Sequence, residues 1–461
     1  MNFINGEFVP SVSGKTIPKV DPSTSQVARQ VPDSSLMDLV KAVQSGNKAL
    51  IGWSKSSIED RAIILEKFAF LIRQNAQMFG LAAARDLGTP VSQTLSFSVE
   101  EAAQHFEAHA KMLRAPGPLL QRQTVQPVGL VAIISPASDP LVCLSSRLAP
   151  ALAGGNAVIA KPSRHTPETT ELLAKLSLEA GLPAGVFGIV QGRGDVIGEL
   201  IVQHPGVSTL AFMGSTRIGR RIQSLAADEL KRVHLSLSSK NPVIVFAGVE
   251  LVSTMSSVAA ICAGLFPARS MQGSRLFIHE SIYKPALEML KAHFESVRVG
   301  SPFEIETQMG PLPTQELVGK FHEAVALARF ENGRVITQIS PDASNNNFVR
   351  PVLVADLTNC STLQQDEIIG PLVLASSFKY QHEVLKHINN SPYGRAAFIF
   401  EPEMEKAERV AGKTEVGSIF INLFTPTVKI SGEVPLLKNS GNLPEGLFDL
   451  ANFFSRHSVL R

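Results

Sequence analysis

Two kinds of hydrophobic periodicity divide the chain. Residues 34–114 carry apolar side chains three and four positions apart, as in DRAIILEKFAFLIRQ, and this spacing predicts several amphipathic helices. From residue 128 onward, short apolar runs rich in β-branched residues alternate with helix-like stretches of roughly 12 residues. Such an alternation predicts parallel strands joined by right-handed crossovers, which is a doubly wound α/β arrangement.

The alternating pattern falls into two blocks. The strands expected in the first block are 129–134, 157–160, 186–190, 208–212 and 233–237. The helices expected between them lie near 141–153, 166–180, 194–203 and 215–228. The strands expected in the second block are 242–246, 275–283, 372–378, 396–400 and 418–422. Two α/β domains are therefore predicted.

Two further segments have recognisable local signals. An Asn-Gly pair between alternating apolar residues predicts a β-hairpin over residues 3–9. Residues 115–127 contain three prolines, which end the helical region and predict an extended segment.

Composition and charge narrow the class of protein. With 44% hydrophobic and 18% charged residues the chain reads as globular. The net charge of +2, from 43 basic and 41 acidic residues, gives no reason to expect nucleic acid or an anionic membrane as a partner. No run is long and apolar enough to span a membrane, and the first residues lack a signal-peptide pattern. Three widely spaced cysteines suggest a reducing compartment, so we expect a cytoplasmic protein.

Three predicted strand ends carry residues suited to phosphate. Gly194 in QGRGDVIG and Gly214 with Ser215 in AFMGSTRIG each stand between a strand and a helix, where backbone amides favour an anion. Lys161 leaves another strand at its carboxyl end, the edge at which open α/β sheets bind ligands. Any one of these segments could be an ordinary tight turn. Three on successive strands of one sheet favour a nucleotide site.

The order of motifs resembles the aldehyde dehydrogenase superfamily along nearly the whole chain. The segments that carry the resemblance are FINGEFV, DPST, PVGLVAIISP, PALAGGNAVIAKPS, AGLPAGVFGIVQGRG, HPGVSTLAFMGSTRIGRRI, SSKNPVIV, RLFIHESIY, DEIIGP, YGRAAFIF and VGSIFIN. The resemblance implies a Rossmann-type nucleotide-binding domain, a second α/β domain of the catalytic type, and an arm and tail that build oligomers.

This resemblance also implies domain boundaries. The nucleotide-binding domain is expected over 1–114 and 128–237, and the catalytic-type domain over 238–434. The oligomerisation arm and tail are expected over 115–127 and 435–461, so a homodimer or homotetramer is expected.

The residues at the family's chemical positions differ from the family pattern. Ser270 stands where the family has its nucleophilic cysteine, and Ser236 where it has the glutamate that acts as general base. Ser138 replaces the asparagine whose amide stabilises the oxyanion. A serine hydroxyl is far less acidic than a thiol and needs an adjacent base, so these changes predict a catalytically silent or impaired protein.

The cofactor positions are better preserved. Lys161 and Ser163 match ribose and phosphate contacts, Gly214 and Ser215 match the phosphate turn, and Glu367 matches the glutamate that holds the nicotinamide ribose. Arg164 stands where many members have a glutamate that binds the adenine ribose. Because an arginine attracts a 2′-phosphate, two outcomes are open: NADP is preferred over NAD, or Arg164 is a surface residue and no dinucleotide binds.

Three functions stay open on these residues. The first is a silent member that acts as scaffold, subunit or nucleotide sensor. The second is an oxidoreductase that converts an aldehyde to the acid with NAD(P)+, with Cys262 as the nearest thiol to Ser270. The third is a hydrolase that uses Ser270 itself. An NAD(P) reduction assay with a Cys262→Ala variant separates the first two, and a fluorophosphonate probe tests the third.

Two more local features have competing interpretations. Asp139 and Arg269 either pair across the former substrate tunnel and block it, or lie apart as solvated charges. His105 and His109 stand one helical turn apart, a spacing that can ligate zinc, but without a third ligand we expect a solvated helix face and no metal site.

Overall fold

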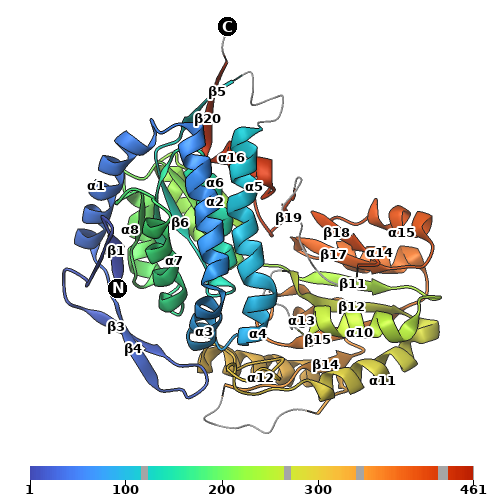
Figure 1. The fold of residues 1–461 in the computed structure, drawn as a ribbon. Helices are drawn as coiled ribbons and strands as arrows, with labels where there is room; N and C mark the ends of the chain where they lie inside the picture. Colours follow the sequence, from blue (N-terminus) through green and yellow to red (C-terminus); the bar gives the residue numbers. More distant parts are fainter. Residues whose placement is uncertain (116–122, 264–270, 339–346, 424–433, 460–461) are drawn as a thin grey trace.

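Two seven-stranded sheets organise the molecule (Figure 1). The computed structural model describes residues 1–115, 123–263, 271–338, 347–423 and 434–459. The strand order of the first sheet is β10 (Arg232–Ser236), β9 (Thr209–Met213), β6 (Leu130–Ile134), β7 (Ala157–Lys161), β8 (Phe187–Ile189), β1 (Asn2–Ile4) and β2 (Glu7–Val9). Strands β6 to β10 are parallel, while β1 and β2 form an antiparallel hairpin at one edge.

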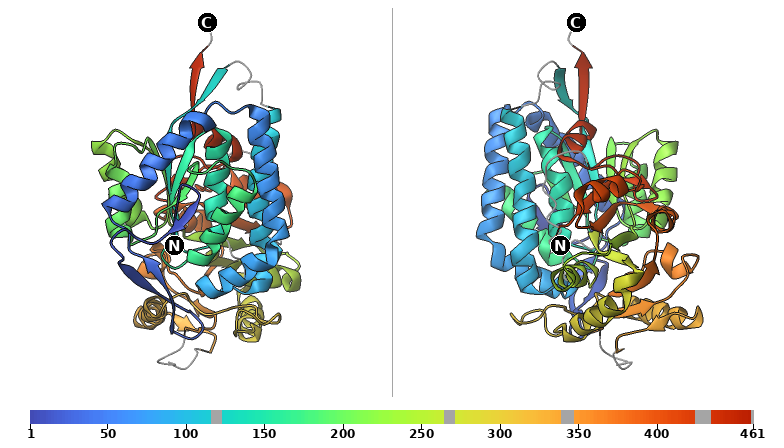
Figure 2. Two further views of the ribbon diagram at one scale, coloured as in Figure 1. Left: turned by 60° about the vertical axis from the view of Figure 1, so that its left-hand side comes forward. Right: turned by 90° about the vertical axis from the view of Figure 1, so that its right-hand side faces the viewer.

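Helices cover both faces of this first sheet, as Figure 2 shows. One face packs against α1 (Leu36–Trp53), α8 (Glu199–Gln203) and α9 (Thr216–Asp228). The other face packs against α2 (Ile58–Gln74), α3 (Ala76–Leu87), α5 (Val99–Arg114), α6 (Pro140–Ala153), α7 (Pro167–Glu179) and α16 (Leu447–Phe453). The pleat of β6 explains its continuous apolar sequence, because Val131 and Ile133 face one layer while Ala132 faces the other.

The second sheet has the strand order β13 (Arg334–Val335), β14 (Val352–Ala355), β15 (Leu372–Phe378), β12 (Gly273–His279), β11 (Asn241–Val245), β17 (Ala396–Phe400) and β18 (Ser418–Ile421). Every neighbouring pair is parallel except β13 with β14. The helices around it are α10 (Leu251–Cys262), α11 (Glu280–Ser296), α12 (Gln315–Phe330), α13 (Thr362–Gln365), α14 (Gln381–Asn389) and α15 (Met404–Ala411).

Short elements connect and extend the two sheets. They are β3 (Thr16–Val20), β4 (Val27–Pro32), α4 (Val91–Gln93), π-helical η1 (Thr94–Ser98) and η2 (Gly194–Gly198), β5 (Gln123–Pro127), β16 (Tyr393–Gly394), β19 (Leu437–Lys438) and β20 (Ser455–Val459). Strands β5 and β20 pair antiparallel and extend beyond the helices at the top of Figure 1. Among the described residues no helix is both long and apolar enough to cross a membrane.

The two-block α/β prediction is confirmed, and so is the hairpin, in which Asn5 and Gly6 take φ of 55° and 80°. One predicted strand is too long: the run 275–283 ends as a strand at His279 because the ring of that residue accepts a hydrogen bond from the amide of Ser281 and begins α11. The prediction also missed β14, although its short apolar run VLVA is of the same kind as those of the other strands and all four residues are buried.

Candidate functional site

The order of the first sheet places a ligand site between β6 and β9. After β6 the chain first adds β7 and β8 on one side of that strand and then returns to add β9 and β10 on its other side. The strand order therefore reverses between β6 and β9, and open α/β sheets bind ligands at such a point. The loop after β6 and the turn after β9 both border one cavity of about 420 Å³. Residues of the second half of the chain close its other side, so the cavity lies between the two sheets.

The turn after β9 provides a cradle at one end of this cavity. A side chain at Gly214 would place its Cβ 2.7 Å from the ring of Phe212, so only glycine fits there without a shift. Ser215 caps α9 by accepting a hydrogen bond from the amide of Ile218, which directs the amino end of this helix toward the cavity. Across the cavity, Glu367 accepts a hydrogen bond of 3.1 Å from the amide of Ser239. This end suits an anionic ligand, and the Glu367 carboxylate can also accept hydrogen bonds from hydroxyl groups of such a ligand.

Other predicted cofactor residues lie at neighbouring strand ends and do not border the cavity. Burial, reinforced by the charge of Arg164, lowers the pKa of Lys161 to about 8, and its Nζ donates to the carbonyl of Pro162 at 3.0 Å. Ser163 begins a turn in which its carbonyl accepts from the amide of Thr166, and Arg164 is exposed.

Gly194 begins η2, and a Cβ added there would meet no protein atom within 4 Å. The chain's own packing therefore does not require glycine at this position.

Ser236, at the end of β10, is enclosed by a buried ionic triad. Arg395 donates to the Ser236 hydroxyl at 2.6 Å and to Glu445 at 2.5 Å, while Arg147 donates to the same carboxylate at 2.6 Å. Both arginine side chains are about 5% exposed or less, and all four residues border the cavity. Burial opposes the charge on Glu445, but the two arginines outweigh it and hold the pKa of this carboxyl well below its usual range.

The loop after β6 ends in a left-handed residue that caps α6. Asp139 has φ 40°, and its carboxylate accepts hydrogen bonds from the hydroxyl of Ser98 at 2.9 Å and the amide of Val142 at 3.3 Å. Burial nevertheless raises the pKa of Asp139 to about 6. Glu101, on α5, also borders the cavity; burial and then the charge of Asp139 raise its pKa to about 8. The carbonyl of Ser138 accepts a hydrogen bond from the thiol of Cys143 at 3.1 Å.

Only one of the three cysteines borders the cavity. Cys262, the thiol proposed from the sequence, is completely buried in the core between α10 and the second sheet, so that part of the oxidoreductase hypothesis is wrong. Cys360 is exposed elsewhere. Cys143 lies on the wall, where burial and the charge of Asp139 raise its pKa to about 12. Ser270 and Arg269 lie outside the described residues, so their predicted roles stay predictions.

The histidine pair is not a solvated face. His109 is 1% exposed, and its Nδ1 hydrogen-bonds with the carbonyl of His105, a residue that borders the cavity. The expectation failed because α5 packs against α2 on one side and α6 on the other. Within the described ranges, no cluster of three or more His, Cys, Asp or Glu could hold a metal ion.

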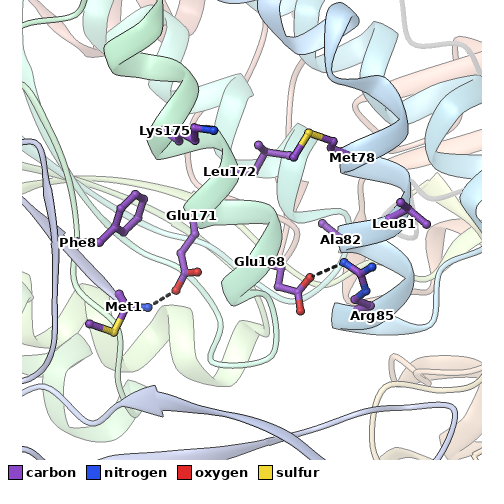
Figure 3. Close-up of a pocket in the computed structure, with 10 residues that line it drawn as sticks. All are labelled: Met1, Phe8, Met78, Leu81, Ala82, Arg85, Glu168, Glu171, Leu172 and Lys175. Carbon is purple, nitrogen blue, oxygen red and sulfur yellow. Dashed lines mark hydrogen bonds and ion pairs between the residues drawn. The ribbon is translucent and has the colours of Figure 1, made fainter.

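A second cavity, of about 360 Å³, lies between α3 and α7 (Figure 3). Met78 of α3 and Leu172 of α7 form part of its apolar wall, and an ion pair of 3.3 Å joins Arg85 to Glu168 at its rim. Helix α3 separates the two cavities, because Phe79 and Ala83 on another of its faces border the larger one. Among the residues that the structure describes, none of those predicted for the nucleotide site or the chemistry lines this second cavity.

Several residues of the larger cavity had not been predicted, because nothing in the local sequence marks them: Glu101, Cys143, Arg395 and Glu445. Arg147 is the exception. It is one charged residue in the otherwise uncharged run LVCLSSRLAPALA, and such a charge in a buried helix needs a partner.

Comparison with known proteins places this geometry in a family. A hydroxyisobutyraldehyde dehydrogenase from Mycolicibacterium austroafricanum is 30% identical, with 96% of this chain and 89% of that protein covered. A 2-aminomuconic semialdehyde dehydrogenase from Bos taurus is 31% identical over 98% and 96%. The solved structure of a mutant of the indole-3-acetaldehyde dehydrogenase AldA from P. syringae, in complex with NAD+ and IAA, has a TM-score of 0.93, 28% identity, and coverage of 99% and 95%. The model of the aldehyde dehydrogenase family matches residues 8–456, and the chain belongs to this family.

Proposed function

We propose that this protein holds an NAD-type dinucleotide at the carboxyl edge of its first sheet and does not oxidise aldehydes through a thiolate. It would then act as a scaffold, a subunit or a nucleotide sensor. The observation that carries the proposal is the state of Ser236. Its hydroxyl is held by Arg395, and the carboxylate that shares this arginine, Glu445, is bound by two arginines and has a pKa far below neutrality. A carboxylate in that state is a poor general base.

The thiols support the same proposal. A cysteine with a pKa of about 12, as at Cys143, is almost entirely protonated at neutral pH, while Cys262 is enclosed in the core. An active thiol in a family of this chemistry needs the opposite environment, with cations or a helix amino end that lower the pKa.

The dinucleotide part of the proposal rests on the Gly214 cradle, Glu367 and the buried amine of Lys161, which suit the phosphates and ribose of such a ligand. The related indole-3-acetaldehyde dehydrogenase was solved with NAD+ bound. Arg164 leads us to propose a preference for NADP, because its exposed guanidinium can pair with a 2′-phosphate. Replacing Arg164 with glutamate should reverse the ratio of the two affinities in a calorimetric titration.

The second candidate is the oxidation of an aldehyde to the acid with NAD(P)+. The names of the relatives favour it, since they are aldehyde dehydrogenases, and the comparisons support this candidate better than the silent one. One described residue gives it a route, because the Cys143 thiol borders the cavity and follows Ser138 by five residues.

One experiment separates the two candidates. NAD+ and NADP+ binding is measured by calorimetry, and reduction of the cofactor is followed with hydroxyisobutyraldehyde, betaine aldehyde and indole-3-acetaldehyde. Binding without turnover supports the silent protein. Turnover that disappears in Cys143→Ala and survives in Cys360→Ala, the exposed control, would establish the second candidate.

We also propose a homodimer or homotetramer in the cytoplasm. The β5–β20 ribbon has only two strands, which is marginal in isolation, so strands of a second copy would stabilise it. The three unpaired cysteines fit a reducing compartment. Light scattering after size exclusion gives the oligomer size, and a monomer would contradict the proposal.

A further inference from the structure

The charged side chains on the wall of the larger cavity fall into two groups of opposite sign. Glu101 and Asp139 form an acidic group near the amino end of α6. Arg147, farther along the same helix, and Arg395, which precedes β17, form a basic group bridged by Glu445. Glu367 belongs to the cofactor end, where it holds the amide of Ser239.

The acidic group has no cationic partner among the residues that the structure describes. The carboxylate of Asp139 accepts only from the neutral donors Ser98 and Val142, and Glu101 makes no hydrogen bond or ion pair within the same ranges. The raised pKa of each carboxyl agrees with two acids enclosed together without a counter-ion. A cation between the two carboxyls would stabilise the ionised form of each.

The basic group carries an uncompensated positive charge. Two arginines share the single carboxylate of Glu445, which leaves a net charge of one positive unit inside the protein. Both arginine side chains are at least nine-tenths buried. Their Nε atoms are buried as well and make no hydrogen bond in the described part of the chain. A buried pair of guanidinium groups with one excess positive charge favours a carboxylate.

One face of α6 connects the two groups. Asp139, Cys143 and Arg147 are spaced four residues apart and therefore lie on the same face, with about 12 Å between the first and last Cα atoms. Cys143 stands between the groups, close enough for the charges of Asp139 and Arg147 to act on its thiol with opposite sign. Ser138 and His105 supply neutral polar atoms to the same wall.

We infer that this cavity binds a small ω-amino acid, with its ammonium between Asp139 and Glu101 and its carboxylate at the Arg147–Arg395 pair. Such a ligand places one charge of the required sign at each end and neutralises the positive excess of the basic group. This inference goes beyond the proposed function, because binding here needs neither a dinucleotide nor turnover.

Calorimetry of the protein without dinucleotide tests the inference with three probes of similar size. 4-Aminobutyrate carries both charges, butyrate only the negative one and butylamine only the positive one. We expect 4-aminobutyrate to bind about tenfold or more tightly than either of the others. Comparison with glycine and 6-aminohexanoate then shows which distance between the ammonium and the carboxylate of the ligand fits the cavity best.

Variants of the acidic group test where the ammonium of the ligand binds. Asp139→Asn and Glu101→Gln should each weaken 4-aminobutyrate about tenfold while leaving butyrate unchanged, because they remove only the ammonium contacts. Glu100→Gln is the matched control: it neighbours Glu101 but is exposed and pairs with Arg73. Equal affinity for butyrate and 4-aminobutyrate would overturn the inference and would favour the pairing of Asp139 with Arg269. Absence of binding by all three probes would also overturn it, whatever the result of the NAD+ titration.

Discussion

Replacing Asp139 with asparagine isolates the electrostatic character of the cavity. Asparagine can keep both contacts of the aspartate, because its carbonyl oxygen accepts from the amide of Val142 and its amide nitrogen donates to the hydroxyl of Ser98. It also tolerates the left-handed backbone, here with φ 40°. The substitution therefore removes one titrating charge with little change of shape.

The expected effect on stability follows from the raised pKa. Because Asp139 has a pKa of about 6 in place of 3.8, the folded protein binds the proton more tightly than the unfolded chain. The resulting stability is present below pH 3.8 and is lost as the pH rises through 6. The full loss is about 3 kcal/mol, of which about 1.4 kcal/mol falls between about pH 5 and pH 8. The asparagine variant should lack this contribution of Asp139 and keep only that of Glu101, whose pKa burial raises to about 8.

Thermal unfolding of both proteins across this pH range measures the difference. The Tm of Asp139→Asn should rise relative to wild type by roughly 2–4 °C for each kcal/mol as the pH increases. Glu100→Gln controls for the loss of an exposed carboxylate on the neighbouring helix, and its difference from wild type should stay constant. A difference between Asp139→Asn and wild type that does not change with pH would refute the reasoning.

Three further results are expected. Glu445→Gln should lower the free energy of unfolding by about 3–5 kcal/mol, because it leaves two buried arginines without their counter-charge. The control Glu415→Gln, at an exposed pair with Lys438, should change that free energy by no more than about 0.5 kcal/mol. Equal Tm shifts in the two variants would contradict this expectation. Iodoacetamide at neutral pH should label Cys360 and spare Cys143 in peptide mass spectrometry, and rapid labelling of Cys143 would show that its thiol ionises far more easily than we infer. Gly194→Ala should leave the Tm unchanged, since the added methyl meets no protein atom, and should weaken NAD+ several-fold; unchanged affinity would remove Gly194 from the phosphate site.

The fold could be predicted from the sequence because each parallel strand of the first sheet is a short apolar run that can be recognised locally. The run LVAII of β6 is apolar at every position, as expected for a strand covered on both faces, and Gly214 follows β9, whose sequence TLAFM is apolar after its first residue. Where two elements meet without a breaking residue, as at His279, the pattern overestimated the strand. The cap that ends it is a side-chain hydrogen bond, which periodicity does not encode.

The chemical site was accessible only in part. Ser138 follows one predicted strand and Ser236 lies near the end of another, and the structure places both on the wall of one cavity. Their charged neighbours come from distant parts of the chain: Arg147 and Glu445 are 298 residues apart, and Arg395 is 50 residues from Glu445. The sequence around each of these three residues contains no local pattern that identifies its ion-pair partner. Long-range ion pairs of this kind follow from the packing of the two sheets, which the sequence does not specify residue by residue.

The charges of the cavity bear on catalysis independently of the missing family groups. A thiolate and the oxyanion that forms after its attack are both negative, and at neutral pH the ionised carboxylate of Asp139 would repel either one, while Glu101, with a pKa of about 8, would repel them at higher pH. The thiol of Cys143 already reports this field, since burial and Asp139 together raise its pKa to about 12. Restoring a cysteine, a glutamate and an asparagine at the three serine positions would leave that repulsion in place. The same two carboxylates stabilise an ammonium group, so the charges that oppose aldehyde oxidation are those that favour an amino acid as ligand.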